Sequence, residues 1–210
     1  MPQRPPPPSQ RAQVRRLPER GAYDRRTIDA ILDEGLVCHV GFAVEGQPYV
    51  LPTTYARMGD LLVMHGSQSN RMFRVLASGA PACVTVSLLD GLVLARSAFH
   101  HSMNYRSVVV LGCARAVEGR EAKRAALEAI VEHVAPGRLR QVRPPTDPEV
   151  DGTIVVEFPV VEASAKVRSG PPMDDPEDLA LDCWAGVIPL HLARGEPVPD
   201  AHVPAGKAAT

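Results

Sequence analysis

The chain has 210 residues, of which 45% are hydrophobic and 22% charged, and its formal net charge is −1 at pH 7. This composition is typical of a globular protein with one domain and short appendages. A charge so close to zero creates no field that favours nucleic acid or an anionic membrane. Aromatic residues make up only 4% of the chain, which argues against a sheet that stacks bases. We therefore expect neither a nucleic-acid nor a membrane partner.

The two ends of the chain differ in composition from its middle. Residues 1–17 are rich in Pro, Gln and Arg and predict a disordered tail. Residues 18–195 are the expected folded domain, and 196–210 a flexible C-terminal tail. No apolar run approaches the roughly 18 residues that a membrane span needs, and the N-terminal residues lack the apolar region of a secretory signal. These features predict a cytoplasmic protein.

The four cysteines are far apart in the sequence and form no CxxC pair. They are Cys38, Cys83, Cys113 and Cys183. Three of them stand in apolar segments, so we expect buried, reduced thiols rather than disulfides or a metal site.

The first half of the domain begins with a helix and continues with strands. Asp24 is placed to cap a helix that ends at Gly35, and its apolar face is Ile28, Ile31 and Leu32. Alternating apolar residues then predict three strands joined by tight turns, at 36–44, 47–58 and 61–67. A short helix is expected over 70–77.

The second half adds longer strands and one strong helix. Two or three strands are expected in 82–97 and 105–117, and a last long strand at 153–170, in which Pro159 suggests a bulge or an edge. The segment 120–134 predicts an amphipathic helix. Its expected inner face is Ala125, Leu127, Ile130, Val131 and Val134. A polar loop separates this helix from the last strand.

The order of these elements predicts the fold class. Short connections favour antiparallel neighbours, because parallel strands need long crossovers. A sheet of six or more strands best avoids exposed edges by closing on itself. The pattern therefore predicts a mainly β (α+β) protein, a small closed or split barrel with flanking helices.

The sequence contains no GxGxxG after a strand, no P-loop, no HExxH and no GxSxG motif. Polar residues cluster instead at strand ends. The first cluster joins residues 52–57 with 65–71 and could seat a phosphate at Gly66, Ser67 and Asn70. Ordinary β-propensity and helix capping explain the same residues without a ligand.

Two further clusters lie later in the chain. In 97–112, His100 and His101 would point to opposite faces of a strand, which disfavours a metal pair. Near the C-terminus, Lys166 and Arg168 share one face of a strand by the two-residue period. Trp184 either packs as an ordinary apolar residue or covers a flat ligand.

Five segments carry a family resemblance in the order in which they occur. They are RGAYDRRTIDAILDEGLVCHVGF, PYVLPTTYARMGDLLVMHGSQSNRM, DGLVLARSAFHHSMNYRSVVVLG, AKVRSGPP and WAGVIPL. Together they resemble the pyridoxamine 5′-phosphate oxidase-like superfamily of FMN-binding split barrels, in its nitroimidazole-resistance-related branch. The resemblance spans about residues 20–192. It implies a six-stranded antiparallel split β-barrel with flanking helices, and a homodimer with FMN in a cleft that both subunits line.

Transferred residue by residue, the resemblance implies a set of cofactor-binding positions. They are Pro52, Thr53, Thr54, Tyr55, His65, Gly66, Ser67, Asn70, Arg71, Ser97, His100, Asn104, Tyr105, Arg106, Ser107, Lys166, Arg168 and Trp184. Asn70 and Arg71 belong to the phosphate end, and 104–107 to the phosphate and ribityl pocket. His65 is the candidate catalytic proton donor.

These expectations describe an FMN-dependent oxidoreductase that takes electrons from a small donor and reduces a small organic acceptor. The run of basic residues with which the true oxidases hold the substrate phosphate is missing, so vitamin B6 is not the expected substrate. The alternative is a non-catalytic module that binds a flavin, the deazaflavin F420 or haem. For haem, His100 or His101 would be the axial ligand.

Overall fold

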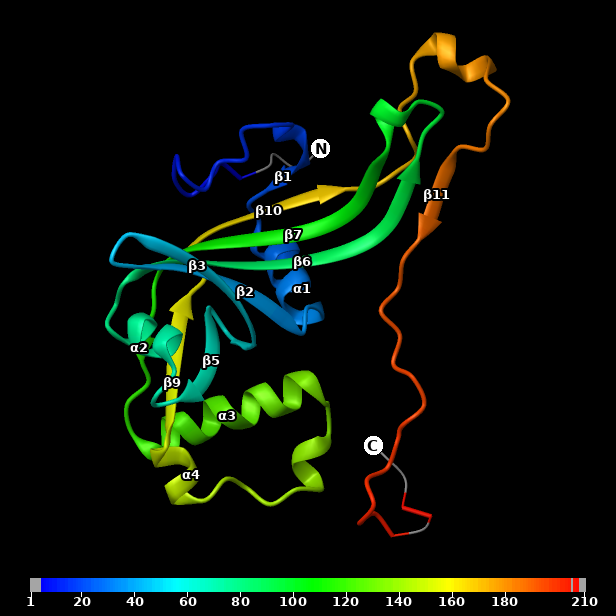
Figure 1. Ribbon diagram of the computed structural model, residues 1–210. Helices are drawn as coiled ribbons and strands as arrows, with labels where there is room; N and C mark the ends of the chain where they lie inside the picture. Colours follow the sequence, from blue (N-terminus) through cyan, green and yellow to red (C-terminus); the bar gives the residue numbers. More distant parts are fainter. Residues whose placement is uncertain (1–4, 205, 208–210) are drawn as a thin grey trace.

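The computed structural model describes residues 5–204, 206 and 207. Figure 1 shows two antiparallel sheets with α-helices packed around them. Among the described helices, none is both long and apolar enough to cross a bilayer. The expectation of a mainly antiparallel β-fold with flanking helices is confirmed.

The larger sheet has the strand order β1-β10-β7-β6-β2-β3, and β11 pairs with β6 outside this order. Its strands are β1 (Gly21–Ala22), β2 (Val37–Val44), β3 (Gln47–Thr54), β6 (Pro81–Leu94), β7 (Ser102–Cys113), β10 (Glu162–Arg168) and β11 (Gly186–Pro189). The smaller sheet has the order β4-β5-β9-β8. Its strands are β4 (Ala56–Met58), β5 (Leu61–Ser67), β8 (Arg115–Ala116) and β9 (Thr153–Pro159).

Two segments that we expected to be single strands each divide between the two sheets. Residues 47–58 break at Tyr55, whose side chain is fully buried and whose hydroxyl donates to the Leu32 carbonyl at 2.6 Å. Residues 153–170 break after Pro159, which has no N–H to continue a ladder. The next amide, that of Val160, donates to the Asp60 carbonyl at 2.8 Å. These breaks carry the chain from one sheet to the other.

The main core lies on one face of the larger sheet. The first helix, α1 (Arg25–Glu34), packs against β6, β7 and β10 with the predicted face of Ile28, Ile31 and Leu32. Asp24 caps it as expected, because its carboxylate accepts from the Thr27 amide at 2.8 Å.

The remaining helices surround the smaller sheet (Figure 1). They are α2 (Arg71–Ala77), α3 (Arg120–Val134) and α4 (Asp147–Asp151). The expected inner face of α3 is wrong in part: Ala126 and Ile130 are buried, whereas Ala125 and Val131 are exposed. In the smaller sheet the helix packs against β4, β5 and β9, and a narrow apolar stripe suffices for this contact. The predicted polar loop contains α4, which a Thr146 and Glu149 capping box begins.

All four cysteines are free thiols, but only some are buried. Cys38 is buried, and burial raises the pKa of its thiol to about 12. Cys113 and Cys183 are exposed, contrary to the expectation. Cys113 ends β7 at a position that alternates away from the core, and Cys183 lies in the loop before β11. Apolar neighbours in the sequence do not bury a residue at a strand end.

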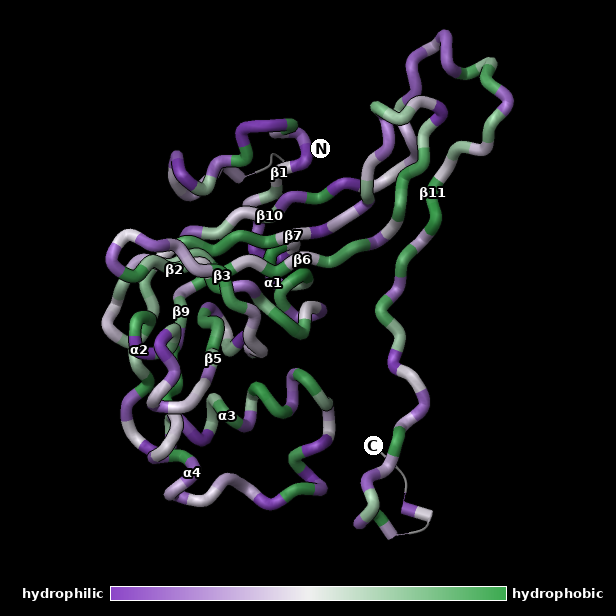
Figure 2. Tube along the Cα trace, viewed as in Figure 1, coloured by the Kyte–Doolittle hydropathy of each residue, from purple (hydrophilic) through white to green (hydrophobic). Residues whose placement is uncertain are grey.

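Three segments extend beyond the two sheets. The long strands β6 and β7 leave the body as a curved hairpin, and β11 runs beside it (Figure 1). We call this hairpin the arm; its tip carries the short helix η2 (Ala98–His100). The N-terminal segment from residue 5 is mainly hydrophilic (Figure 2) and lies beside β10, where Arg11 pairs with Glu162 and Ala12 is buried. After β11 the described residues, 190–204, 206 and 207, contain no helix or strand.

Candidate functional site

The larger sheet leaves its second face uncovered over most of its width. In an antiparallel sheet, residues opposite each other project to the same face. The row Val40, Val84 and Val110 is buried in the core. The neighbouring rows therefore project the other way. These rows, which we call the open face, contain Val37, His39, Val50, Pro52, Thr54, Thr85, Ser87, Ser107, Val109 and Lys166.

The open face mixes exposed apolar side chains with hydroxyls. Val50, in the middle of β3, is 65% exposed, and Val37, the first residue of β2, is 43% exposed. Thr54 and Ser87 are exposed beside them. A surface of this kind fits a partner or a flat ligand better than bulk water.

The first predicted cluster separates on the two faces of β3. Pro52 and Thr54 lie on the open face, as the alternation requires. Thr53 projects to the opposite side and is half-buried. Tyr55 lies in the core, where its hydroxyl donates a hydrogen bond to the Leu32 carbonyl and burial raises its pKa. Its side chain is therefore not presented to a ligand on this face.

The turn from β5 into α2 combines structural roles with free cations. Gly66 leaves room for the ring of Phe73, which a Cβ would meet at 2.2 Å. Asn70 caps α2 by accepting from the Met72 amide at 2.9 Å, and Arg71 lies 4.1 Å above the ring of Tyr49.

A pocket of about 440 Å³ opens on α2. We call it the α2 pocket; it is lined by Ser69, Arg71, Arg74, Val75 and Ser78. Among the ion pairs of the described residues, none involves Arg71 or Arg74. The exposed Ser67 hydroxyl lies 3.0 Å from that of Ser69 at its edge. Two unpaired guanidinium groups beside hydroxyls suit an anionic group such as a phosphate.

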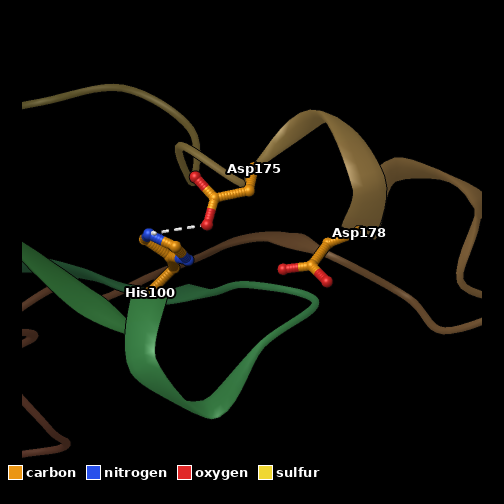
Figure 3. A group of neighbouring side chains, drawn as sticks. All are labelled: His100, Asp175 and Asp178. Carbon is orange, nitrogen blue, oxygen red and sulfur yellow. Dashed lines mark ion pairs between the residues drawn. The ribbon is translucent and has the colours of Figure 1, made fainter.

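The histidines of the arm are tied to the backbone turn at its tip. Ser97 caps η2, its hydroxyl lies 2.9 Å from Nδ1 of His100, and its carbonyl lies 2.9 Å from Nδ1 of His101. Figure 3 shows His100 facing Asp175 and Asp178, with the ligand atoms of all three within 4.8 Å of one another. Exposed acidic groups gather in this way without a metal, so the geometry assigns no ion here.

Arg106 is occupied by protein carboxylates. Its guanidinium donates to Glu34 and, at 2.7 and 2.9 Å, to Asp90. These two contacts lower the pKa of each carboxyl group and raise that of Arg106. In the sheet Arg106 stands opposite Leu88 and Val167, which do not belong to the open-face rows. Its side chain is thus held by α1 and β6 rather than free for a phosphate.

Arg168 and Asn104 meet each other in a buried contact. The Arg168 guanidinium donates to Asn104 Oδ1 and to the Pro171 carbonyl, and Asn104 Nδ2 donates to the Gly170 carbonyl at 3.1 Å. Among the described residues Arg168 has no carboxylate partner, and burial lowers its pKa, with the charge of Arg20 adding to the effect. Arg168 and Arg20 both line a pocket of about 740 Å³ beside β1.

The other late candidates lie apart from this pair. Lys166 and Ser107 are opposite each other on the open face, and the Ser107 hydroxyl donates to the Lys166 carbonyl at 3.4 Å. Tyr105 is half-buried, opposite Arg168. Trp184 is 64% exposed, and its ring lies against Gly186 before β11.

His65 stands apart from the open face. It projects from β5 towards α3 and lines a separate pocket of about 410 Å³ with Leu127, Ile130 and Val131. Its Nδ1 is buried without a hydrogen-bond partner, and burial lowers its pKa. His65 and Gly66 were both expected to bind the cofactor, but the His65 side chain faces the opposite way from Gly66.

A family model described as pyridoxamine 5′-phosphate oxidase matches residues 24–167. The chain belongs to this family. No curated protein matches it.

Solved structures of the same fold extend this result beyond the matched segment. The chain is 41% identical to the flavocytochrome Anf3 from Azotobacter vinelandii, with a TM-score of 0.91, over 98% of this chain and 96% of that one. It is 36% identical to an FAD- and haem-binding protein from Mycobacterium smegmatis, with a TM-score of 0.87, over 91% and 94% of the two chains. A proposed 5-nitroimidazole resistance protein from Bacteroides thetaiotaomicron is 28% identical, with a TM-score of 0.59, over 70% and 86%.

The sequence alone did not identify several residues that line the α2 pocket and the pocket beside His65. Arg74 was overlooked, although it follows Arg71 by three positions on α2 and so shares its side of the helix. The wall formed by Leu139 and Val142 was also missed, since these residues lie in an apparently plain polar loop. The sequence offers no clear signal for this wall, because the exposure of Val131 beside the buried stripe of α3 is seen only in the structure.

Proposed function

We propose that this protein is a redox protein that binds a flavin nucleotide and a haem, and that it transfers electrons from a small donor to a small organic acceptor. The observation that carries this proposal is the match, over nearly the whole chain, to a flavocytochrome and to an FAD- and haem-binding protein. The likeness includes β11 and the segment after it, which lie outside the matched family segment.

The flavin phosphate is assigned to the α2 pocket. Arg71 and Arg74 bring two positive charges without carboxylate partners, and Ser69 and Ser78 add hydroxyls. Arg106, in contrast, is already neutralised by Glu34 and Asp90. A phosphate gains most from guanidinium groups that are not already paired.

The ring system of the flavin is assigned to the open face near β3. Its wide apolar and hydroxyl surface fits a flat heterocycle with a polar edge. Pro52 and Thr54 lie on β3, the strand whose Tyr49 hydroxyl accepts from Arg71 at 3.4 Å. One face of a sheet cannot enclose a ring, so a second copy of the chain is the proposed cover.

The haem fits the part of the chain that lies away from the open face. The pocket behind His65 is apolar, and the unpartnered imidazole supplies a neutral nitrogen donor of the kind that binds iron. When bound, a flavin accepts or donates a hydride and a haem passes single electrons. The residues of this chain would hold the two groups, exclude water from them and set their potentials through hydrogen bonds.

The test is cofactor analysis of the purified full-length protein. We expect flavin and haem absorption in the wild-type protein, and mass spectrometry then distinguishes FMN, our expected flavin, from FAD and from a deazaflavin. Arg71→Ala with Arg74→Ala should lower flavin retention by roughly 10-fold or more, because two charge-assisted contacts are lost. Arg120→Ala is the matched control, since Arg120 lies on α3 and pairs with Asp151. A protein that neither carries nor takes up a flavin would overturn the proposal.

A further inference from the structure

The pocket between β5, α3 and the following loop is mainly apolar and adjoins the titratable side chain of His65. We call it the α3 pocket. Its walls are Leu127, Ile130 and Val131 from α3 and Leu139 and Val142 from the loop. Its volume of about 410 Å³ is within the range of small-molecule sites. Glu128, Arg143 and Glu149 supply the polar side chains of its lining.

His65 enters this pocket because of the alternation along β5. Met64 is packed in the main core and Gly66 faces Phe73, so His65 projects to the side on which α3 lies. Neither ring nitrogen has a hydrogen-bond partner in the described part of the chain, and Nδ1 is buried. A buried polar atom without a partner costs about 1–3 kcal/mol. The imidazole is therefore placed for a ligand rather than for the stability of the core.

We propose that the α3 pocket holds the haem and that the imidazole of His65 is an axial ligand of its iron. This inference rests on the proposed function, which includes a haem near His65, and it specifies the pocket and the ligand of the iron. The geometry points to an apolar macrocycle because leucine, isoleucine and valine side chains surround one nitrogen donor. Burial keeps this donor neutral, and a neutral imidazole coordinates iron.

The polar side of the pocket suits the acidic edge of the macrocycle. Arg143 lines the pocket and pairs with Glu149 at 2.6 Å across an exposed surface. An exposed ion pair of this kind contributes little to stability, so its guanidinium can turn to a propionate at small cost. Glu128 and Glu149 also line the pocket, and Glu149 is the partner of Arg143.

The other histidines of the described chain are less suited to the role. Nε2 of His133 lies 2.7 Å from the Gly35 carbonyl. His100 and His101, which the sequence offered as axial ligands, lie on the arm, where His100 faces two carboxylates. Acidic and exposed surroundings suit a hydrated cation better than a macrocycle. His39 is exposed on the open face, and His191 and His202 are exposed in the segment after β11.

The test is a haem titration of the full-length protein and of single variants, followed by absorption spectroscopy. We expect His65→Ala to weaken haem binding by roughly 10-fold or more and to change the Soret band, because the iron loses its protein ligand. Flavin content should stay as in the wild type, since His65 lies away from the α2 pocket. His101→Ala is the matched control and should leave the Soret band unchanged.

A second variant separates ligand loss from misfolding. His65→Gly with added imidazole should regain the wild-type Soret band, because free imidazole can occupy the space left by the side chain. An unchanged spectrum in His65→Ala, or loss of the band in His101→Ala, would overturn this assignment while leaving the proposed function intact. A wild-type protein that retains flavin but takes up no haem would overturn the haem part of both.

Discussion

At the scale of single residues, partners decide what a charged side chain can do. Arg71 and Arg106 both belong to polar clusters in the sequence, and nothing local distinguishes them. In the structure Arg106 is held by Glu34 and Asp90, whereas Arg71 lies over Tyr49 without a carboxylate. The first is therefore a structural ion pair, and the second remains available to an anion.

The Arg106 ion pairs predict a pH-dependent contribution to stability. Both carboxyl groups have a folded pKa below their ordinary value, mainly because Arg106 donates to them. The stabilisation is therefore complete above the unfolded pKa of about 4 and disappears as the pH falls through the folded values. We expect Arg106→Met to lower the free energy of unfolding at pH 7 by about 1 kcal/mol. The difference from the wild type should shrink below about pH 4.

Urea unfolding at several pH values measures this difference. Arg115→Met is a matched control, because Arg115 pairs with Glu157 but is 69% exposed, so its removal should have a smaller effect. A variant of Arg106 with unchanged stability and lost flavin would contradict the structural role and favour a contact with the cofactor.

At the scale of elements, short helices and strand breaks position the candidate sites. The helix α2 has only 7 residues, so its start depends strongly on Asn70, which accepts from two backbone amides. This cap fixes the turn from which Arg71 and Arg74 project. The same residue type could have served a phosphate, and the structure shows that its Oδ1 atom is used by the helix.

The cap predicts different results for two substitutions at position 70. Asn70→Ala should lower the free energy of unfolding by about 1 kcal/mol, because the amide of Met72 loses its acceptor. Asn70→Asp keeps an acceptor and should stay within roughly 0.5 kcal/mol of the wild type. Thermal and urea denaturation of both variants provide the measurement. Equal loss of stability in the two variants would show that capping is not the role of Asn70.

At the scale of the whole molecule, one face of the larger sheet and the segment after β11 expose apolar side chains. The open face exposes Val37 and Val50, and the segment after β11 exposes Leu192 at 88% and Val198 at 92%. Exposed apolar residues along a strand face and an extended tail fit a second copy of the chain better than solvent. A homodimer with the flavin under the open face is therefore our proposal.

This proposal predicts the effect of a charge on the open face. Val50→Glu should produce monomers and lower flavin retention, because a carboxylate in the centre of an apolar contact has no partner. Val161→Glu is the matched control, since Val161 is 76% exposed in the link between β9 and β10, away from the open-face rows. Light scattering after gel filtration should give the wild type a mass near twice 22.6 kDa. A wild type that is a monomer would contradict the proposed dimer.

The sequence by itself determined the local elements and the family. The Asp24 cap, the apolar face of α1 and the tight turns between strands depend on neighbouring residues, so periodicity was enough to find them. Five segments that match in the order in which they occur also carried the family resemblance, and the match to the family model confirms it.

Only the tertiary structure decided which side chains meet. The breaks at Tyr55 and Pro159 divide two expected strands between different sheets, because a distant carbonyl and a missing amide act there. Other contacts between distant segments place His65 against α3 and join Arg106 to Glu34 of α1. Such pairings join residues far apart in the sequence, and no local pattern records them, since their energy depends on packing between elements.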